Sequence, residues 1–335
     1  MIKLNETLWE SLRHRAERLP HAVLIQGPEG VGKLALAERL AGRLLCESPT
    51  ELSDACGRCE GCRWVGAGTH PDLRRLEPDA LAENVGSSEE SERETRGGRR
   101  AKPSIEIRVD QIRELSNFLY LGSHRGRRRV AIVHPAEAMN DNAANALLKG
   151  LEEPPAGAMF LLVSHHPARL LPTIRSRCVV VSVARPEESA ALAWLEAITP
   201  PVRDAKRWLA FSGGSPRLAR EYADGERGAR VGPYLEALAK GAVDRMPEAT
   251  DRESLESLAE ALQKHAVDQF TRALAGRSVY GTVASSGDRR SAPSLAWIGF
   301  ARYMGWARAL TRHPVNPRLF SSEMISKVSK LIKSM

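Results

Sequence analysis

A glycine-rich segment near the amino terminus constrains the fold of this chain more than any other feature. The segment Gly27-Pro-Glu-Gly30-Val-Gly32-Lys33 matches the pattern G-x-x-x-x-G-K. A short apolar run, residues 22–26, precedes it, and a helical pattern with leucines at 36, 40 and 44 follows. In this strand–turn–helix context, backbone N–H groups and the helix N-terminus face an anion, and Lys33 adds a full charge. The sequence therefore predicts a phosphate loop with Gly27, Gly30, Gly32 and Lys33 as binding residues.

The groups that hydrolyse a bound nucleotide are missing from this loop. Leu34 stands where a Ser or Thr hydroxyl would ligate magnesium. The apolar run 130–133 should end in an acidic pair, but His134 and Pro135 follow it, and Glu137 lies too far along unless the backbone takes a different path. We therefore expect ATP or ADP to bind weakly or not at all, no magnesium site, and no ATP hydrolysis by this chain alone.

The rest of the first half alternates between strand and helix patterns. Further short apolar runs lie at 160–163 and 179–183. One helical pattern starts at Asp110, a plausible N-cap. A second covers 140–152 and is stopped by the two prolines that follow. Such strands, buried on both faces, predict an α/β fold with a parallel sheet. After Pro186 the patterns are helical, with short helices to about residue 227 and a polar interruption at 276–293.

One segment resembles no packed core. Residues 77–103 are acidic first and basic afterwards, with almost no aliphatic side chains, and they predict a disordered insertion. A phosphate-binding role for Arg96, Arg99 and Arg100 is the alternative to a solvated loop.

Four of the five cysteines are close together in the sequence: Cys46, Cys56, Cys59 and Cys62. A Cys-x-x-Cys-x-x-Cys run with a fourth thiolate upstream suits a tetrahedral structural zinc site. An iron–sulfur cluster uses the same ligands, and disulfides or free thiols are the remaining alternatives. Cys178 stands apart beside an apolar run and is expected to be a core residue.

The overall composition is that of a globular protein with a net charge of +8. This charge favours a polyanionic neighbour such as DNA, although it also fits a basic protein that merely stays in solution. We expect no signal peptide, because residues 1–19 alternate charged and apolar side chains and have no long apolar core. We expect no membrane association, because the most apolar late stretch, 295–310, contains Arg302 and Arg308 and is short for a span. A cytoplasmic location follows by default.

Three further motifs join these features. They are the run Ala143-Ala-Asn-Ala-Leu-Leu-Lys-Gly-Leu-Glu-Glu-Pro-Pro155, the triplet Ser176-Arg177-Cys178, and the segment Ala67 to Asp72 after the cysteines. Together with the phosphate loop and the cysteines, they resemble the bacterial clamp-loader subunits of DNA polymerase III, the tau/gamma and delta-prime chains. The similarity runs from residue 20 to about 220 and is weak beyond. Because delta-prime chains commonly lack the magnesium ligand and the acidic pair, the chain resembles this type more than tau/gamma.

The resemblance implies a division into three domains. Residues 1–184 would form an AAA+ module with a zinc-binding insertion at about 46–62 and the disordered insertion at 77–103. Residues 185–228 would form a small helical lid, and residues 229–335 an all-α collar domain. The implied partners are tau/gamma and delta subunits in a heteropentamer, the sliding clamp, and primed DNA bound through the complex.

The resemblance also implies roles for two arginines. Arg177 would project into the ATP site of the adjacent subunit as an arginine finger, where a guanidinium favours the transition state; a local carboxylate partner is the alternative. Arg217 occupies the position of the family's second sensor arginine, although packing of the lid explains it equally well. Ser164 or His165 could occupy the first sensor position, and neither is assigned.

Three functions compete at this point. The first is a delta-prime stator, which does not hydrolyse ATP but assists a neighbour's hydrolysis through Arg177. The second is an active tau/gamma-type motor, which Leu34, His134 and Pro135 argue against. The third is a zinc-dependent DNA-binding module, which would leave the Ser176-Arg177-Cys178 motif unexplained.

Overall fold

The chain divides into two compact units in a computed structural model, one of residues Asn5–Arg185 and one that includes Pro186–Met335. The structure describes residues 5–49, 54–82, 104–121, 128–283, 295–311 and 313–333. None of the helices in these ranges is long and apolar enough to cross a bilayer.

The first unit is built on a five-stranded sheet in which every pair of neighbours is parallel. The strands, in the order β2-β3-β4-β1-β5, are Leu73–Leu76, Arg129–Val133, Ala158–Ser164, Ala22–Gln26 and Val179–Ser182. The predicted α/β class with a parallel sheet is confirmed. β2 escaped prediction because its two central residues are exposed arginines, so that it carries no apolar run.

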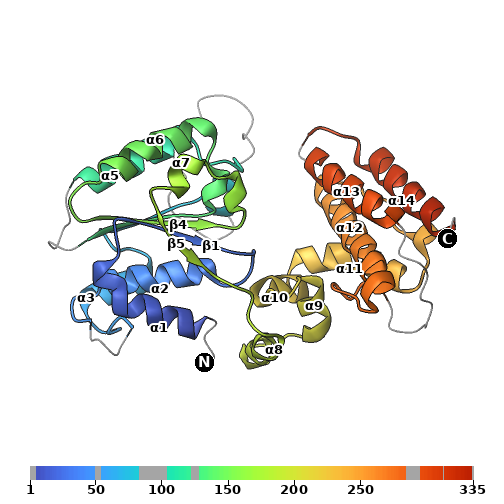
Figure 1. Ribbon diagram of the computed structural model, residues 1–335, viewed down its shortest axis with the longest axis horizontal. Helices are drawn as coiled ribbons and strands as arrows, with labels where there is room; N and C mark the ends of the chain where they lie inside the picture. Colours follow the sequence, from blue (N-terminus) through green and yellow to red (C-terminus); the bar gives the residue numbers. More distant parts are fainter. Residues whose placement is uncertain are drawn as a thin grey trace. The chain divides into compact units, whose positions relative to one another are not determined.

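Helices cover both faces of this sheet (Figure 1). On one face lie α1 (Glu6–Arg15), α2 (Lys33–Leu45) and α3 (Glu60–Ala67); on the other lie α5 (Val109–Tyr120), α6 (Asp141–Glu152) and α7 (Pro172–Arg175). Successive strand residues point to opposite faces, so Val23 and Ile25 join the core under α2 whereas Ala22 and Leu24 join the core under α5 and α6.

The two predicted helix starts had different outcomes. α6 begins as expected, because the Asn140 side chain accepts a hydrogen bond from the Ala143 N–H and caps the helix. The prediction of Asp110 as an N-cap was wrong. Arg108 holds that position, its N–H donates to the Gln111 side chain at 2.8 Å, and Asp110 lies in the first turn of α5.

The strand β5 corrects the prediction of a run buried on both faces. Val179 and Val180 are 45% and 47% exposed. The reason is the strand's position at the edge of the sheet, where among the described strands it pairs only with β1.

The start of the predicted disordered insertion is ordered, so that prediction was wrong for residues 77–82. Asp79–Ala82 form a short helix, α4. Glu77 accepts hydrogen bonds from Arg75 at 2.8 Å and from His134 at 2.9 Å. Burial raises the pKa of Glu77, but these two partners outweigh it and hold the pKa below its usual value. Residues 83–103, with Arg96, Arg99 and Arg100, lie outside the described residues.

The elements that the structure describes in the second unit are all helices, as predicted. Its helices are α8 (Glu188–Ala197), α9 (Ala205–Phe211), α10 (Pro216–Asp224), α11 (Glu226–Ala239), α12 (Arg252–Ala275), α13 (Leu295–Leu310) and α14 (Pro317–Lys333). A small apolar cluster joins α8 to α9 and α10, and a larger one joins α9 and α10 to α11–α14. The predicted division at residues 228/229 stays a prediction.

Two buried carboxylates on α12 organise this second unit. Asp268 is fully buried and accepts hydrogen bonds from the N–H groups of Val279, Tyr280 and Thr282 and from the Thr282 hydroxyl. The first residues of the predicted polar interruption at 276–293 are therefore fastened to α12. Glu260 accepts from the Tyr222 hydroxyl at 2.6 Å and pairs with Lys264 at 2.8 Å.

Candidate nucleotide and metal sites

The phosphate loop has the backbone conformation that its glycines permit. Gly27, Gly30 and Gly32 have φ of 152°, 75° and 92°, a region that favours glycine. Gly27 is also sterically required, because a Cβ built on it would lie 2.2 Å from the Val183 carbonyl oxygen. Gly32 is the N-cap of α2, so the loop leads directly into a helix N-terminus. The predicted binding residues are thus brought together.

The lysine of the loop is almost completely buried, with 2% of its surface exposed. Its ammonium group donates to the carbonyl oxygen of Pro28 in the same loop. Burial lowers the pKa of Lys33 to about 8, against the opposing effect of Glu137 and Glu29. Lys33 therefore remains largely protonated at pH 7 and can attract an anion.

The positions that should hold magnesium and water carry no suitable group. Leu34 packs against the apolar core beneath α2. His134 directly follows β3, but its Nδ1 faces Glu77 at 2.9 Å, and Pro135 offers no side-chain ligand.

Glu137 lies closer to the loop than its sequence position suggested. One oxygen, Oε1, accepts the N–H groups of His165 and His166 at 2.8 and 2.9 Å, which fastens Glu137 to the end of β4. β4 pairs with β1 up to Ser164, and Gly27 of the loop donates its N–H to the Ser164 carbonyl oxygen. The carboxylate consequently acts on Lys33 electrostatically. This proximity depends on the path of residues 134–138, which no motif encodes.

At this end of β4 the Ser164 hydroxyl lies beside the Glu137 carboxylate and favours its charged form, and the buried Nδ1 of His165 has no hydrogen-bond partner among the described residues. Burial lowers the pKa of His165 to about 4, and the charge of Lys33 adds to the effect, so the imidazole is neutral at pH 7. Ser164 and His165, both considered for the first sensor position, therefore lie beside the loop as uncharged polar groups.

The four predicted cysteine ligands converge. The Sγ atoms of Cys46, Cys56, Cys59 and Cys62 all lie within 4.8 Å of one another. Tetrahedral zinc with Zn–S bonds of about 2.3 Å requires sulfurs about 3.8 Å apart, and Cys56 Sγ lies 3.8 Å from Cys62 Sγ. The donor set and its spacing fit a closed, structural metal site.

Backbone N–H groups point at three of these sulfurs. Cys56 N–H donates to Cys46 Sγ at 3.2 Å, and Cys59 and Cys62 donate to the preceding cysteine's sulfur at 3.3 Å each. The N–H groups of Arg58 and Cys59 lower the pKa of the Cys56 thiol to about 6. Such donors favour the thiolate form of Cys56, the form that binds metal, whereas burial and the neighbouring thiols raise the pKa of Cys62.

The segment Ala67–Asp72 anchors the cysteine region to the sheet. His70 is buried, accepts the Asp72 N–H at Nδ1, and contacts the Trp64 ring edge-on at 5.7 Å between ring centroids. Asp72 is also buried and lies 3.2 Å from Arg129, at the start of β3. This part of the motif therefore has a structural explanation.

The two predicted functional arginines lie in different units. Arg177, between α7 and β5, pairs with Glu152 at 2.6 Å and donates to the Thr173 carbonyl oxygen at 2.9 Å. This is the local carboxylate partner considered as the alternative to an arginine finger. Its side chain is nevertheless 35% exposed. Arg217 is exposed on α10 of the second unit, and its role as a sensor stays a prediction.

Comparison with known proteins identifies the family. A family model described as "DNA polymerase III, delta subunit" matches residues 4–187. The DNA polymerase III subunit delta' of Pseudomonas aeruginosa is 46% identical over 217 residues, which is 64% of this chain and 59% of that protein. The subunit delta' of Escherichia coli K12 is 38% identical over 207 residues, 62% of this chain and 55% of that protein. The similarity thus spans less than two thirds of these relatives' own lengths.

Among solved structures, a DNA polymerase III gamma subunit-related protein from Thermotoga maritima covers 95% of this chain and 97% of its own, with 16% identity and a TM-score of 0.47. The family assignment depends on the sequence matches alone. Because the matching model covers more than half of the 335 residues, the chain belongs to the DNA polymerase III delta subunit family.

Proposed function

We propose that this chain is a delta-prime-type stator subunit of a DNA polymerase III clamp loader, an AAA+-type subunit that does not hydrolyse ATP itself. In this role it helps to load the sliding clamp onto primed DNA, in the cytoplasm. The relatives that share 46% and 38% of the matched residues bear the delta' name.

One observation carries the proposal. The loop keeps Lys33, but Leu34 stands where the metal ligand would be, and His134 and Pro135 stand after β3 where the acidic pair would be. Magnesium and a positioned water supply much of the barrier reduction in phosphoryl transfer. Glu137 does not stand in their place, because it lies four residues after β3 ends and is held at the end of β4 by two backbone N–H groups. Any ATP or ADP would bind through the loop glycines and Lys33 without magnesium.

The chain's part in hydrolysis is then to supply Arg177 to a neighbouring subunit. The exposure of Arg177 and its position between α7 and β5 are compatible with a reach into another chain's site. A guanidinium that approaches the phosphates of a neighbour's ATP stabilises the transition state electrostatically.

The four cysteines hold a structural zinc ion. Four thiolates fill a tetrahedral shell and leave no open position for a substrate, and the sulfur spacing meets the requirement of such a shell. The zinc contributes folding energy to the region between α2 and α3. An iron–sulfur cluster would give a coloured protein, so metal analysis together with an absorption spectrum distinguishes the two.

The partners of this subunit are tau/gamma and delta chains in a heteropentamer, with the 229–335 region forming part of the collar. The sliding clamp and primed DNA are bound through the complex, and the net charge of +8 favours that neighbourhood.

The test is ATP turnover by the purified chain alone and by the same chain added to tau/gamma and delta subunits. We expect no turnover by the chain alone and a higher rate of clamp loading when it completes the complex. Brisk turnover by the chain alone would refute the stator assignment in favour of a motor.

A further inference from the structure

We propose that metal in the four-cysteine site controls how firmly the amino-terminal helix α1 is held on α2 and on the phosphate loop, with Asp54 as the linking residue. The proposal rests on the proposed zinc ion but on no other part of the proposed function. Its physical basis is a continuous set of polar contacts from the cysteine region to the loop.

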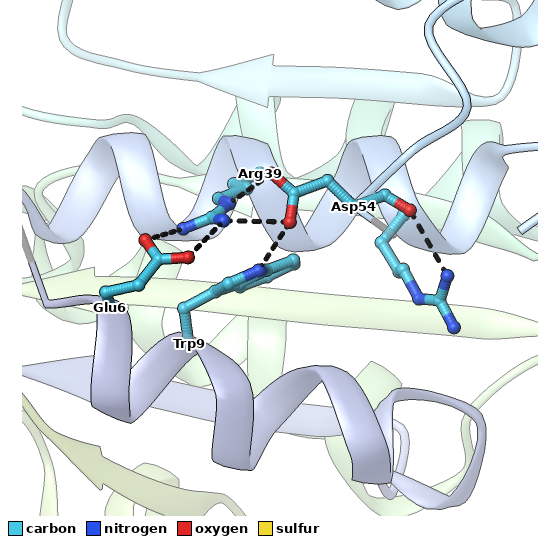
Figure 2. A network of polar contacts seen from close by, with 5 residues as sticks. Glu6, Trp9, Arg39 and Asp54 are labelled. Carbon is cyan, nitrogen blue, oxygen red and sulfur yellow. Dashed lines mark hydrogen bonds and ion pairs between the residues drawn. The ribbon is translucent and has the colours of Figure 1, made fainter. Parts of the chain in front are cut away.

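Asp54 lies two residues before Cys56 and is bound from three sides (Figure 2). Its carboxylate accepts two hydrogen bonds from Arg39, each 2.8 Å long, and one of 2.6 Å from the indole N–H of Trp9. Its backbone carbonyl oxygen accepts from Arg43 at 3.2 Å. Arg39 and Arg43 belong to α2, and Trp9 to α1. Asp54 therefore joins both helices to the cysteine segment.

Arg39 extends the network to the first turn of α1. Its guanidinium forms a two-pronged pair with the Glu6 carboxylate, with distances of 3.0 and 2.9 Å, and stacks over the Trp9 ring at 4.2 Å from the centroid (Figure 2). Trp9 is fully buried. A planar guanidinium that binds two carboxylates and stacks on a ring has a single favoured position. Because Asp54 helps to hold Arg39 in this position, loss of Asp54 would also weaken the contacts of Arg39 with Glu6 and Trp9.

Helix α1 in turn touches the phosphate loop. Asn5, which precedes α1, donates its side-chain N–H to the carbonyl oxygen of Val31 at 2.8 Å. Val31 lies between the second and third glycines of the loop and shares one apolar core with Trp9 and Leu12 of α1. The position of α1 thus bears on the loop through both polar and apolar contacts.

The metal enters this chain of contacts through Cys56, two residues after Asp54. Cys46 is the C-cap of α2, and its sulfur accepts the Cys56 N–H. A metal bound by Cys46 and Cys56 holds Cys56 at the C-terminal end of α2. Asp54 then has less conformational freedom to lose when it binds Arg39 and Trp9. Because such coupling is reciprocal, the docking of α1 raises the metal affinity by the same factor.

The experiment is hydrogen exchange measured by mass spectrometry on the full chain, loaded with zinc and again after a chelator has removed it. We expect backbone amides of residues 6–15 and 27–32 to exchange about tenfold faster or more without zinc, since several charge-assisted hydrogen bonds lose their support. Amides of α12, in the other unit, serve as the internal reference and should not change.

Two substitutions separate the link from the metal. D54N removes the negative charge of Asp54 and leaves the four cysteine thiols in place. It should speed the hydrogen exchange of backbone amides in residues 6–15 even with zinc bound. D79N is the matched control, because Asp79 also pairs with an arginine, Arg108 at 3.1 Å, away from this network. D79N should leave the hydrogen exchange rates of residues 6–15 unchanged. In zinc titrations, D54N should bind zinc more weakly than D79N.

The outcomes are distinct. A chain that neither contains nor takes up zinc overturns the metal assignment and the coupling together. A zinc-binding chain whose residues 6–15 exchange equally fast with and without zinc, or in wild type and zinc-loaded D54N, overturns the coupling and leaves the metal site standing.

Discussion

Replacement of Arg177 by alanine should have a small effect on the stability of the fold and a large effect on ATP hydrolysis in the assembled complex. In the folded chain the arginine side chain is 35% exposed and its partner Glu152 is 49% exposed. A solvent-screened pair of this kind contributes about 0–1 kcal/mol to stability, and the hydrogen bond to the Thr173 carbonyl oxygen adds about 1 kcal/mol at most at such a surface. R177A should therefore unfold at most a few degrees below wild type.

The expected effect on hydrolysis is much larger. An arginine finger accelerates phosphoryl transfer by about 10³–10⁵-fold, which corresponds to about 4–7 kcal/mol of transition-state stabilisation. In a complex reconstituted with R177A, the ATP site that faces this subunit should lose most of its activity in a single-turnover assay, while assembly is unchanged. A folded, assembled R177A complex that hydrolyses ATP at the wild-type rate at every site would refute the reasoning.

Two conservative variants sharpen this test. R177K keeps a positive charge but not the planar fork, so it should recover only a small part of the rate. E152Q removes the local partner of Arg177 and leaves the guanidinium in place; it should not lower the rate. A loss in E152Q equal to that in R177A would instead indicate that the pair serves the fold of this surface.

Two further predictions concern the metal and the buried carboxylate of the second unit. C59S should release bound zinc and lower the melting temperature of the chain, whereas C178S, outside the cluster, should keep its zinc; equal zinc contents by elemental analysis would contradict the assignment. Burial raises the pKa of Glu260, but Lys264 and Arg227 outweigh it and lower the pKa to about 2 from 4.5. A depressed carboxylate pKa stabilises the fold above pH 4.5, and this contribution is lost as the pH falls toward 2. By denaturant titration, E260Q should therefore be about 3 kcal/mol less stable than wild type at pH 7, a gap that should close in acid; a gap that is independent of pH would exclude the linkage.

Much of the first unit could be predicted because its signals are local. A continuous apolar run such as β1 has to be buried on both faces, and the glycines and Lys33 lie within seven residues whose conformation is set by their own chemistry. The cysteines were recognisable for the same reason: three of them belong to one short repeat, and their sulfurs do converge.

The features that escaped prediction depend on contacts between distant residues. Trp9 and Asp54 are 45 positions apart, and neither belongs to a motif. Glu137 reaches the neighbourhood of Lys33 only because residues 134–138 turn back toward β4. The exposure of Val179 could not be foreseen either, because an apolar strand at the edge of a sheet has the same pattern as a central one.

The close approach of Gly27 to the Val183 carbonyl oxygen has a consequence for how such loops are interpreted. Any larger residue at this position would collide with the backbone just after β5, with or without a ligand. The first glycine of the motif is thus demanded by the architecture of the domain as well as by phosphate recognition. A chain that catalyses no reaction would meet the same steric demand, so this glycine can persist where hydrolysis is absent.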